Sequence, residues 1–148
     1  MTPSRGQRGK YAEKEVERLF KKLNDEHLGF AWHRYPDTRS ARSFIKAQPC
    51  DYLVSCGTAI HIEVKETEHE FRLPSGRISQ LPVLKKFALA GIPFFVLVFH
   101  STLKKWRCVP ECFFEGDTPP SWDLKGLPLH YTAEDALLAQ KVIPTSKQ

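Results

Sequence analysis

Apolar residues recur along the chain at two different periods, and the longer period predicts the helices. Over residues 7–24 apolar side chains fall every three or four positions, which is typical of a helix with one buried face. A second helix is predicted over residues 80–90, with Ser79 as its N-cap. Thr132 opens a capping-box pattern before a short third helix over residues 133–140. The expected buried positions are Ala12, Val16, Leu19, Phe20 and Leu23 in the first helix and Leu81, Leu84, Phe87 and Ala88 in the second.

The shorter period, in which apolar and polar residues alternate, predicts strands. Strands are expected over residues 30–35, 51–55, 59–65, 94–99 and 105–109. Gly57 marks a turn that joins the second and third of these into a hairpin. The fourth is apolar throughout and is therefore expected to be buried on both faces, with the fifth as its hairpin partner. In the third strand the residues facing one way are Ile60, Ile62 and Val64, and those facing the other way are His61, Glu63 and Lys65.

Three segments lack either period and are interpreted as irregular structure. Residues 36–49 form a basic arm around Phe44, residues 66–77 form a loop, and residues 116–128, rich in Pro and Gly, wrap the surface. The resulting order, αβββαββ followed by a small helix, indicates a mixed α/β domain. A chain of 148 residues suits one domain over residues 1–148, with a core at about 7–110 and a C-terminal wrap and short helix over 111–148.

Composition and charge narrow the function classes. The formal net charge of +5 suits a polyanionic partner. The sequence contains no apolar run of membrane-spanning length and no apolar segment near its start, so we expect a cytoplasmic protein that makes no contact with a membrane. The four cysteines are spaced unlike most zinc ligands, and we interpret them as small buried thiols in preference to a zinc site.

The third strand carries the candidate chemistry. Glu63 and Lys65 share one face of it, and hairpin geometry brings Asp51 beside Glu63 because adjacent strands lie about 4.8 Å apart. Two carboxylates at that spacing form a hard oxygen site that suits Mg²⁺. The alternative is a solvated strand face with a cross-strand ion pair. The same triplet pattern recurs at Asp123-Leu124-Lys125, but there it lacks strand periodicity and a partner aspartate.

A third carboxylate from the first helix would complete a metal site. Glu13 and Glu15 flank the apolar stripe on opposite sides, whereas Glu17 is expected to point farther away. Helical geometry does not choose between Glu13 and Glu15. The simpler and commoner explanation of either one is a charged residue on an amphipathic helix.

These residues resemble the PD-(D/E)XK nuclease superfamily, and within it the RecU-type Holliday-junction resolvases and their phage relatives. The matching segments are Arg8-Gly9-Lys10-Tyr11-Ala12-Glu13, Asp51-Tyr52, Ile62-Glu63-Val64-Lys65-Glu66-Thr67, Phe71-Arg72-Leu73-Pro74, Ile78-Ser79-Gln80 and Gly91-Ile92-Pro93-Phe94. They span about two-thirds of the chain. The sequence departs from the family pattern at Ser79, where the family usually has histidine.

The resemblance implies a restriction-endonuclease-like αβββαβ core, with a mixed sheet flanked by helices. It implies a homodimeric endodeoxyribonuclease that resolves branched or four-way DNA junctions during recombination, in a bacterial or phage-infected cell. It assigns Mg²⁺ as cofactor, with Mn²⁺ able to substitute. The catalytic set that it implies is Glu13, Asp51, Glu63, Lys65 and Gln80, with Asp51, Glu63 and Glu13 as the metal ligands.

Basic residues outside the catalytic set are suited to DNA phosphates more than to base edges. The alternative is that they serve only solubility, as about half of such basic loops do. Two other functions stay open: a PD-(D/E)XK nuclease that nicks or selects single strands, and a DNA-binding module without catalysis. The candidate DNA contacts are Arg5, Arg8, Lys10, Arg39, Arg42, Lys46, Arg72 and Arg77.

Overall fold

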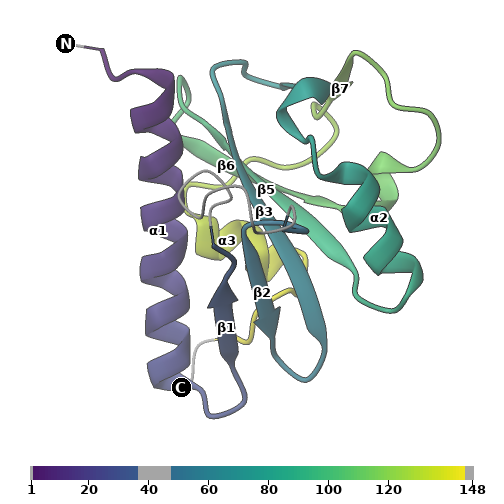
Figure 1. Ribbon diagram of the computed structural model, residues 1–148. Helices are drawn as coiled ribbons and strands as arrows, with labels where there is room; N and C mark the ends of the chain where they lie inside the picture. The colour runs from purple at the N-terminus through teal and green to yellow at the C-terminus, as the bar shows by residue number, and fades with distance from the viewer. Residues whose placement is uncertain (1, 37–47, 146–148) are drawn as a thin grey trace.

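The computed structural model describes residues 2–36 and 48–145, and its centre is a five-stranded mixed sheet with the order β1-β2-β3-β5-β6 (Figure 1). Neighbouring strands are antiparallel except β3 and β5, which are parallel. A parallel pair needs a crossover connection, and the segment that contains α2 supplies it. The strands are β1 (Ala31–Arg34), β2 (Tyr52–Ser55), β3 (Ala59–Thr67), β5 (Phe94–His100) and β6 (Lys105–Pro110). The predicted basic arm, with Arg39, Arg42, Phe44 and Lys46, falls mostly outside the described residues.

Helices α1 (Arg5–Glu26) and α3 (Ala133–Ala139) pack on one face of this sheet. A capping box between Ser4 and Gln7 starts α1, and its buried residues are the five that the periodicity predicted. Thr132 caps α3 by accepting a hydrogen bond from the backbone N–H of Asp135 at 3.0 Å. The core on this side joins both helices to residues of β2, β3, β5 and β6.

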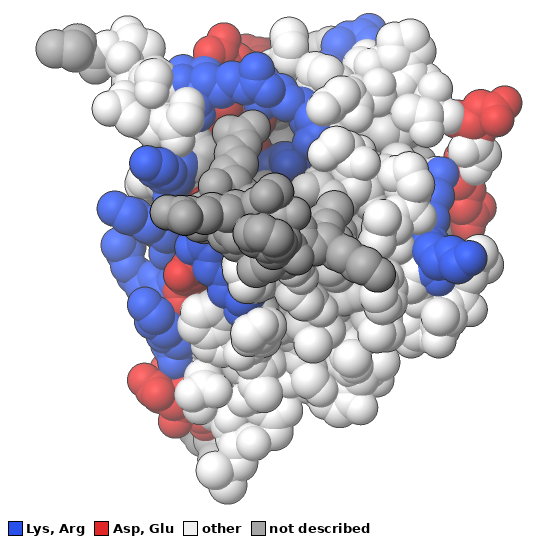
Figure 2. All heavy atoms as spheres, viewed as in Figure 1, with Lys and Arg blue, Asp and Glu red and all other residues white. Residues whose placement is uncertain are grey.

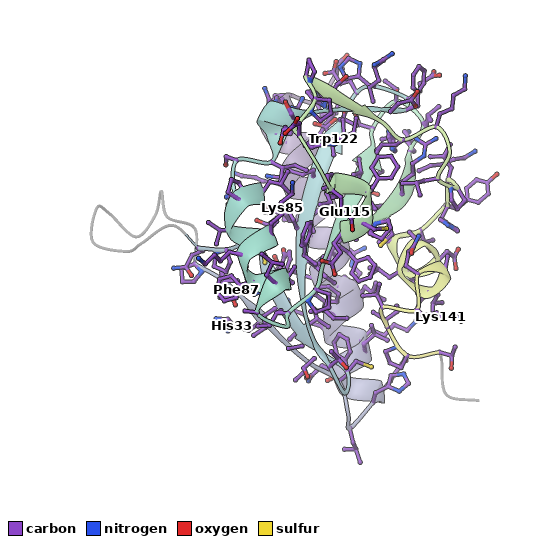
Figure 3. The ribbon with its side chains drawn as sticks, turned by 90° about the vertical axis from the view of Figure 1, so that its right-hand side faces the viewer. His33, Lys85, Phe87, Glu115, Trp122 and Lys141 are labelled. Carbon is purple, nitrogen blue, oxygen red and sulfur yellow. The ribbon has the colours of Figure 1, made fainter. Side chains whose placement is uncertain are left out.

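A second core lies on the opposite face, under α2 (Leu81–Leu89) and a two-stranded sheet of β4 (Arg72–Pro74) and β7 (Ser121–Asp123). Two short 3-10 turns, η2 (Ser75–Arg77) and η3 (Glu111–Phe114), complete this layer. Figure 3 views this side of the molecule, with Phe87 and Lys85 on α2 and Trp122 on β7 labelled. In the described residues, no helix is long and apolar enough to cross a membrane.

Several sequence predictions need correction on this second face. The segment over residues 66–77 is not a loop, because β3 continues to Thr67 and β4 pairs with β7. The segment over 116–128 does more than wrap the surface, since Trp122 is 6% exposed and Leu124 is fully buried. Both errors have one cause: β4 and β7 are three residues long, too short to show a period, and they become strands only by pairing with each other.

The predicted start and buried face of α2 also need correction. The N-cap is Gln80, not Ser79, whose hydroxyl instead donates to the Gln80 side chain at 3.1 Å. Phe87 is 37% exposed, although Leu81 and Leu84 are buried as expected. Phe87 packs edge-on against the His61 ring, with 5.0 Å between the ring centroids, at the border of the buried face of α2.

The four cysteines are free, and two of them match the prediction of buried thiols. Cys50 and Cys108 are buried, Cys56 is half-buried and Cys112 is exposed. Burial raises the pKa of the Cys108 thiol to about 12, so it stays a neutral apolar group.

Candidate active site

The β2–β3 hairpin places Asp51 beside Glu63. Tyr52 pairs with Ile62 in the antiparallel register, so Asp51, one residue before β2, lies across from Glu63. One Asp51 carboxylate oxygen accepts a hydrogen bond from the Val64 backbone N–H at 2.8 Å, which anchors the side chain against β3. The geometry predicted from the turn at Gly57 is therefore present.

Glu63 is the most unusual side chain of this hairpin. It is fully buried, and both of its carboxyl oxygens lack a hydrogen-bond partner among the residues that the structure describes. The pKa of Glu63 lies well above its ordinary value, mainly because burial disfavours the charged form and also because the Asp51 carboxyl is its neighbour. A buried carboxyl without donors is costly, so this group is suited to receiving a cation.

Lys65 supplies a positive charge on the same face of β3. It is half-buried, and it makes no ion pair or hydrogen bond within the described part of the chain. Its charge opposes the upward pKa shifts of both Glu63 and Glu13. Lys65 is thus close enough to both carboxyls to affect them while its own ammonium group is uncommitted.

Among the α1 glutamates, Glu13 is electrostatically linked to Asp51. Burial raises the pKa of Glu13, and the charge of Asp51 is the next largest cause. A carboxylate oxygen of Glu13 lies 3.6 Å from a guanidinium nitrogen of Arg34 on β1. Glu15 lies on the other edge of the helix and pairs with Arg18 at 2.7 Å. Helical periodicity left the choice between Glu13 and Glu15 open. In the packed fold the charge of Asp51 acts on Glu13, whereas Glu15 is paired with Arg18, and the role of Glu13 as a ligand stays a prediction.

The expectation that Glu17 points away from the sheet is wrong. Its carboxylate accepts hydrogen bonds from the Tyr52 hydroxyl at 2.8 Å and from Arg34 at 2.5 Å. Glu17 lies four residues after Glu13, and this spacing puts both on one helix edge. The sequence did not predict these contacts of Glu17, because Arg34 and Tyr52 belong to strands that are distant from α1 in the chain.

Gln80, which the family resemblance adds to the site, stands at the N-terminal end of α2. Its side-chain oxygen accepts a hydrogen bond from the Ser79 hydroxyl at 3.1 Å. Within the described residues, no hydrogen bond joins Gln80 to Asp51 or Glu63. Its place in the site stays a prediction.

Among the described residues, the candidate DNA contacts fall into two groups. Arg5 and Lys10 are exposed, and Arg72 is exposed with its guanidinium 3.3 Å from the Ser121 hydroxyl. Arg8 and Arg77 turn inward instead, with side chains that are 14% and 20% exposed. Figure 2 shows Lys and Arg gathered along the α1 side of the molecule and at the upper end of the same face, with carboxylates between them.

The two inward-turned arginines meet at Glu66, a residue that sequence reasoning did not single out. Arg8 approaches its carboxylate at 3.0 Å, and Arg77 donates to its backbone carbonyl at 2.7 Å. A signal was present in the sequence, because Glu66 continues the alternate positions of Ile62 and Val64, which face the core. A carboxylate on an otherwise apolar strand face predicts a buried ion pair.

The candidate ligands Asp51, Glu63 and Glu13 offer the oxygen donors that a divalent cation prefers, but the three carboxyl groups do not converge on one point. Asp51 and Glu63 offer two adjacent carboxyls, and the Glu63 oxygens are free of other partners among the described residues. Glu13, the third candidate, is engaged by Arg34. Accordingly, no group of three or more His, Cys, Asp or Glu side chains in the described part of the chain is arranged to hold a metal ion. Hard oxygen donors of this kind suit Mg²⁺ or Mn²⁺.

The fold is similar to that of Archaeoglobus fulgidus Hjc, a Holliday junction resolvase from an archaeal hyperthermophile, whose structure is solved at 1.6 Å resolution. The comparison has a TM-score of 0.54 and a sequence identity of 24%, and it covers 84% of this chain and 98% of the Hjc chain. At this identity the likeness establishes the fold, which is the expected restriction-endonuclease-like α/β architecture with a mixed sheet flanked by helices. No model of a known protein family matches the chain, and no curated protein matches it.

Proposed function

We propose that this chain is a magnesium-dependent, structure-specific DNA endonuclease of the PD-(D/E)XK type, related to the RecU-type resolvases, and that it cuts four-way DNA junctions. The observation that carries the proposal is the buried Glu63 carboxyl, without hydrogen-bond partners among the described residues and beside Asp51. Such a group lowers stability unless a cation compensates it. The likeness to the fold of Hjc, a Holliday junction resolvase, supports the choice of substrate class.

The catalytic roles follow from the chemistry of each side chain. Asp51 and Glu63 would hold Mg²⁺, with Mn²⁺ as a substitute and Glu13 as the third ligand once it leaves Arg34. When bound, the ion supplies a water of lowered pKa and neutralises charge on the phosphate. Lys65, which makes no ion pair or hydrogen bond among the described residues, would orient the attacking water as an ammonium group or deprotonate it as a neutral amine. In its charged form it would also offset negative charge that develops on the phosphate. Gln80 lines the site from the start of α2.

DNA binding is proposed to be led by shape and charge. Exposed arginines and lysines around α1 would contact phosphates and would make binding sensitive to salt. Arg8 and Arg77 are held by Glu66, so their contribution to binding should be smaller than that of Arg5 or Lys10. The proposed phosphate contacts are Arg5, Arg8, Lys10, Arg39, Arg42, Lys46, Arg72 and Arg77.

We propose that the active species is a homodimer, built from a single nuclease domain over residues 1–148. One chain carries one candidate centre, whereas resolving a junction needs two symmetric cuts, which a twofold dimer supplies. The exposed apolar side chains of α2 are a candidate contact surface, since Val83, Phe87 and Leu89 are 37%, 37% and 91% exposed. The setting proposed for this dimer is the cytoplasm of a bacterial or phage-infected cell.

The proposal is tested with a labelled four-way junction and a linear duplex of the same sequence, each incubated with Mg²⁺ and then with EDTA. Cleavage of the junction alone, abolished by EDTA, is expected. Lys65→Ala and Glu63→Gln should each abolish cleavage and leave junction binding within a few fold, because both side chains act mainly on the transition state. Full activity in either variant would remove this site from consideration.

The same experiment separates the second candidate function. Asp51, Glu63 and Lys65 serve any PD-(D/E)XK reaction, so a nuclease that nicks duplex DNA or selects single strands fits the same side chains. Cleavage of nicked or single-stranded DNA, with the junction left intact, would favour that function. Junction binding without cleavage of any of these substrates would indicate that the protein is a DNA-binding module without catalytic activity.

A further inference from the structure

The carboxylate of Glu66 is buried in a position that the proposed chemistry does not use. Glu66 is 3% exposed and directly follows Lys65 on β3. Successive strand residues point to opposite faces, so Glu66 lies on the same face as Val64, toward α1, whereas Lys65 shares the face of Glu63. A carboxylate at such a position needs compensating donors.

Two segments that are far apart in the chain donate to one oxygen of this carboxylate, Oε2, and a third donates to the backbone carbonyl of the same residue. Arg8 of α1 donates from Nε to the Glu66 carboxylate at 3.0 Å and also bonds Glu68. The hydroxyl of Ser101, just after β5, donates to the same carboxylate oxygen at 2.6 Å. Arg77 of η2 donates to the Glu66 backbone carbonyl at 2.7 Å. The end of β3 is thus tied to α1, to the end of β5 and to the segment before α2.

The bond from Arg8 to Glu66 and the bond from Tyr52 to Glu17 attach α1 to the sheet on either side of Glu13. Glu13 lies five residues after Arg8 and four before Glu17, which places it about 6–8 Å along the helix axis from each attachment. The apolar stripe between them, which includes Val16 and Phe20, holds α1 on the sheet without fixing its position along it, because hydrophobic contact is non-directional. Charge-assisted hydrogen bonds are directional and set that position.

From this arrangement we propose that Glu66 is a positioning residue, which acts through Arg8 to hold α1 where Glu13 can join Asp51 and Glu63 at the metal. The inference rests on the proposed function, since it takes Glu13 to be a metal ligand. Directional, charge-assisted bonds of this kind fix the geometry of the elements that they join.

The experiment is a double-mutant cycle on Mn²⁺ affinity, followed by electron paramagnetic resonance in the absence of DNA. Glu66→Gln should weaken Mn²⁺ binding by about tenfold or more, as loss of a residue that orients a metal ligand commonly does. Glu13→Gln should weaken it to a similar extent. In the Glu13→Gln background, Glu66→Gln should cause almost no further loss, because there is no ligand left to position.

Two further variants keep the test decisive. Arg8→Lys retains the charge but loses the planar guanidinium, so it should weaken Mn²⁺ binding several fold, and only while Glu13 is present. Glu134→Gln is the matched control, since it breaks the ion pair at 3.5 Å between Lys22 of α1 and Glu134 of α3, away from Glu13. It should leave Mn²⁺ affinity unchanged.

The outcomes separate the inference from the proposed function. Additive losses in the Glu13 and Glu66 double variant, or an unchanged affinity in Glu66→Gln, would overturn the positioning role. If Glu63→Gln still abolishes Mn²⁺ binding in that case, the proposed metal-dependent function stands. If Glu66→Gln does not fold, additive losses for Arg8→Lys and Glu13→Gln would overturn it in the same way. A wild-type chain that binds no Mn²⁺ would overturn this inference together with the metal-dependent function.

Discussion

Replacing Glu63 with glutamine should stabilise the metal-free protein although it abolishes cleavage. Glu63 is fully buried, its oxygens have no partner among the described residues, and Asp51 lies across from it. Glutamine keeps the shape, removes the like charge and offers an amide N–H₂ group that can donate to the Asp51 carboxylate. The substitution therefore removes an unfavourable contribution to the free energy of folding that only a bound cation would offset.

The size of the effect follows from the strand spacing. Two like charges separated by the strand spacing of about 4.8 Å, at an effective dielectric constant of about 20, repel by about 3.5 kcal/mol. Asp51 is half-buried, so solvent screening reduces this value, and we expect a gain of about 1–3 kcal/mol in the free energy of unfolding. For a domain of this size, each kcal/mol raises the melting temperature by about 2–4 °C.

The pH dependence of stability predicts the same direction of change for Glu63→Gln. The pKa of Glu63 is raised in the folded protein, so the folded state binds a proton more tightly than the unfolded chain. Stability from neutral Glu63 is fully present below the ordinary value of 4.5 and is lost as the pH rises through the raised value. The advantage of Glu63→Gln over the wild type should therefore grow between about pH 5 and pH 8.

The assay is urea denaturation in EDTA at both pH values, with Glu66→Gln as the matched control. Both glutamates are buried on β3, but Glu66 is bonded by Arg8 and Ser101. Glu66→Gln should therefore lower stability by about 1–3 kcal/mol, in the opposite direction to Glu63→Gln. A Glu63→Gln protein that is no more stable than the wild type at pH 8 in EDTA would refute the reasoning.

Four further predictions address catalysis, pH and assembly. Glu13→Gln should lower the cleavage rate at least about tenfold, which corresponds to about 1.4 kcal/mol in the activation barrier, whereas Glu15→Gln should change the rate little. Single-turnover rates at several Mg²⁺ concentrations test this, and a larger loss in Glu15→Gln would show that Glu13 is not the third ligand. The pKa of His100 is lowered, mainly by burial, and its ring accepts from Arg107 at 3.1 Å, so its contribution to stability should be complete above pH 6.5 and lost as the pH falls from there through the lowered value. Denaturation from pH 8 to 5 should show this loss in the wild type, and an equal loss in His100→Gln would contradict it. Calcium should support junction binding without turnover, since its larger and looser coordination misplaces the attacking water; a gel-shift and cleavage assay in parallel decides. Light scattering should find a dimer at micromolar concentration, and a monomer both with and without junction DNA would exclude the proposed resolvase.

The elements with a clear period were determined by the sequence alone. The stripe of α1, the turn at Gly57 and the apolar run of β5 each depend on residues that are near one another in the chain. The approach of Asp51 to Glu63 belongs with them, since a tight hairpin sets its own register once its turn is placed. Local pattern was therefore enough to bring two of the candidate carboxyls together.

Contacts between distant segments were decided only by the tertiary structure. The pairing of β4 with β7, the orientation of Glu17 toward Tyr52 and the bonding of Glu66 by Arg8 all join segments that no local period relates. The different surroundings of Glu13 and Glu15 belong here too, because both flank the same apolar stripe, and only the packing of α1 on the sheet leaves Glu13 under the charge of Asp51 and Glu15 paired with Arg18. A period specifies which face of an element is buried, but the neighbours that a polar side chain meets depend on how the elements pack.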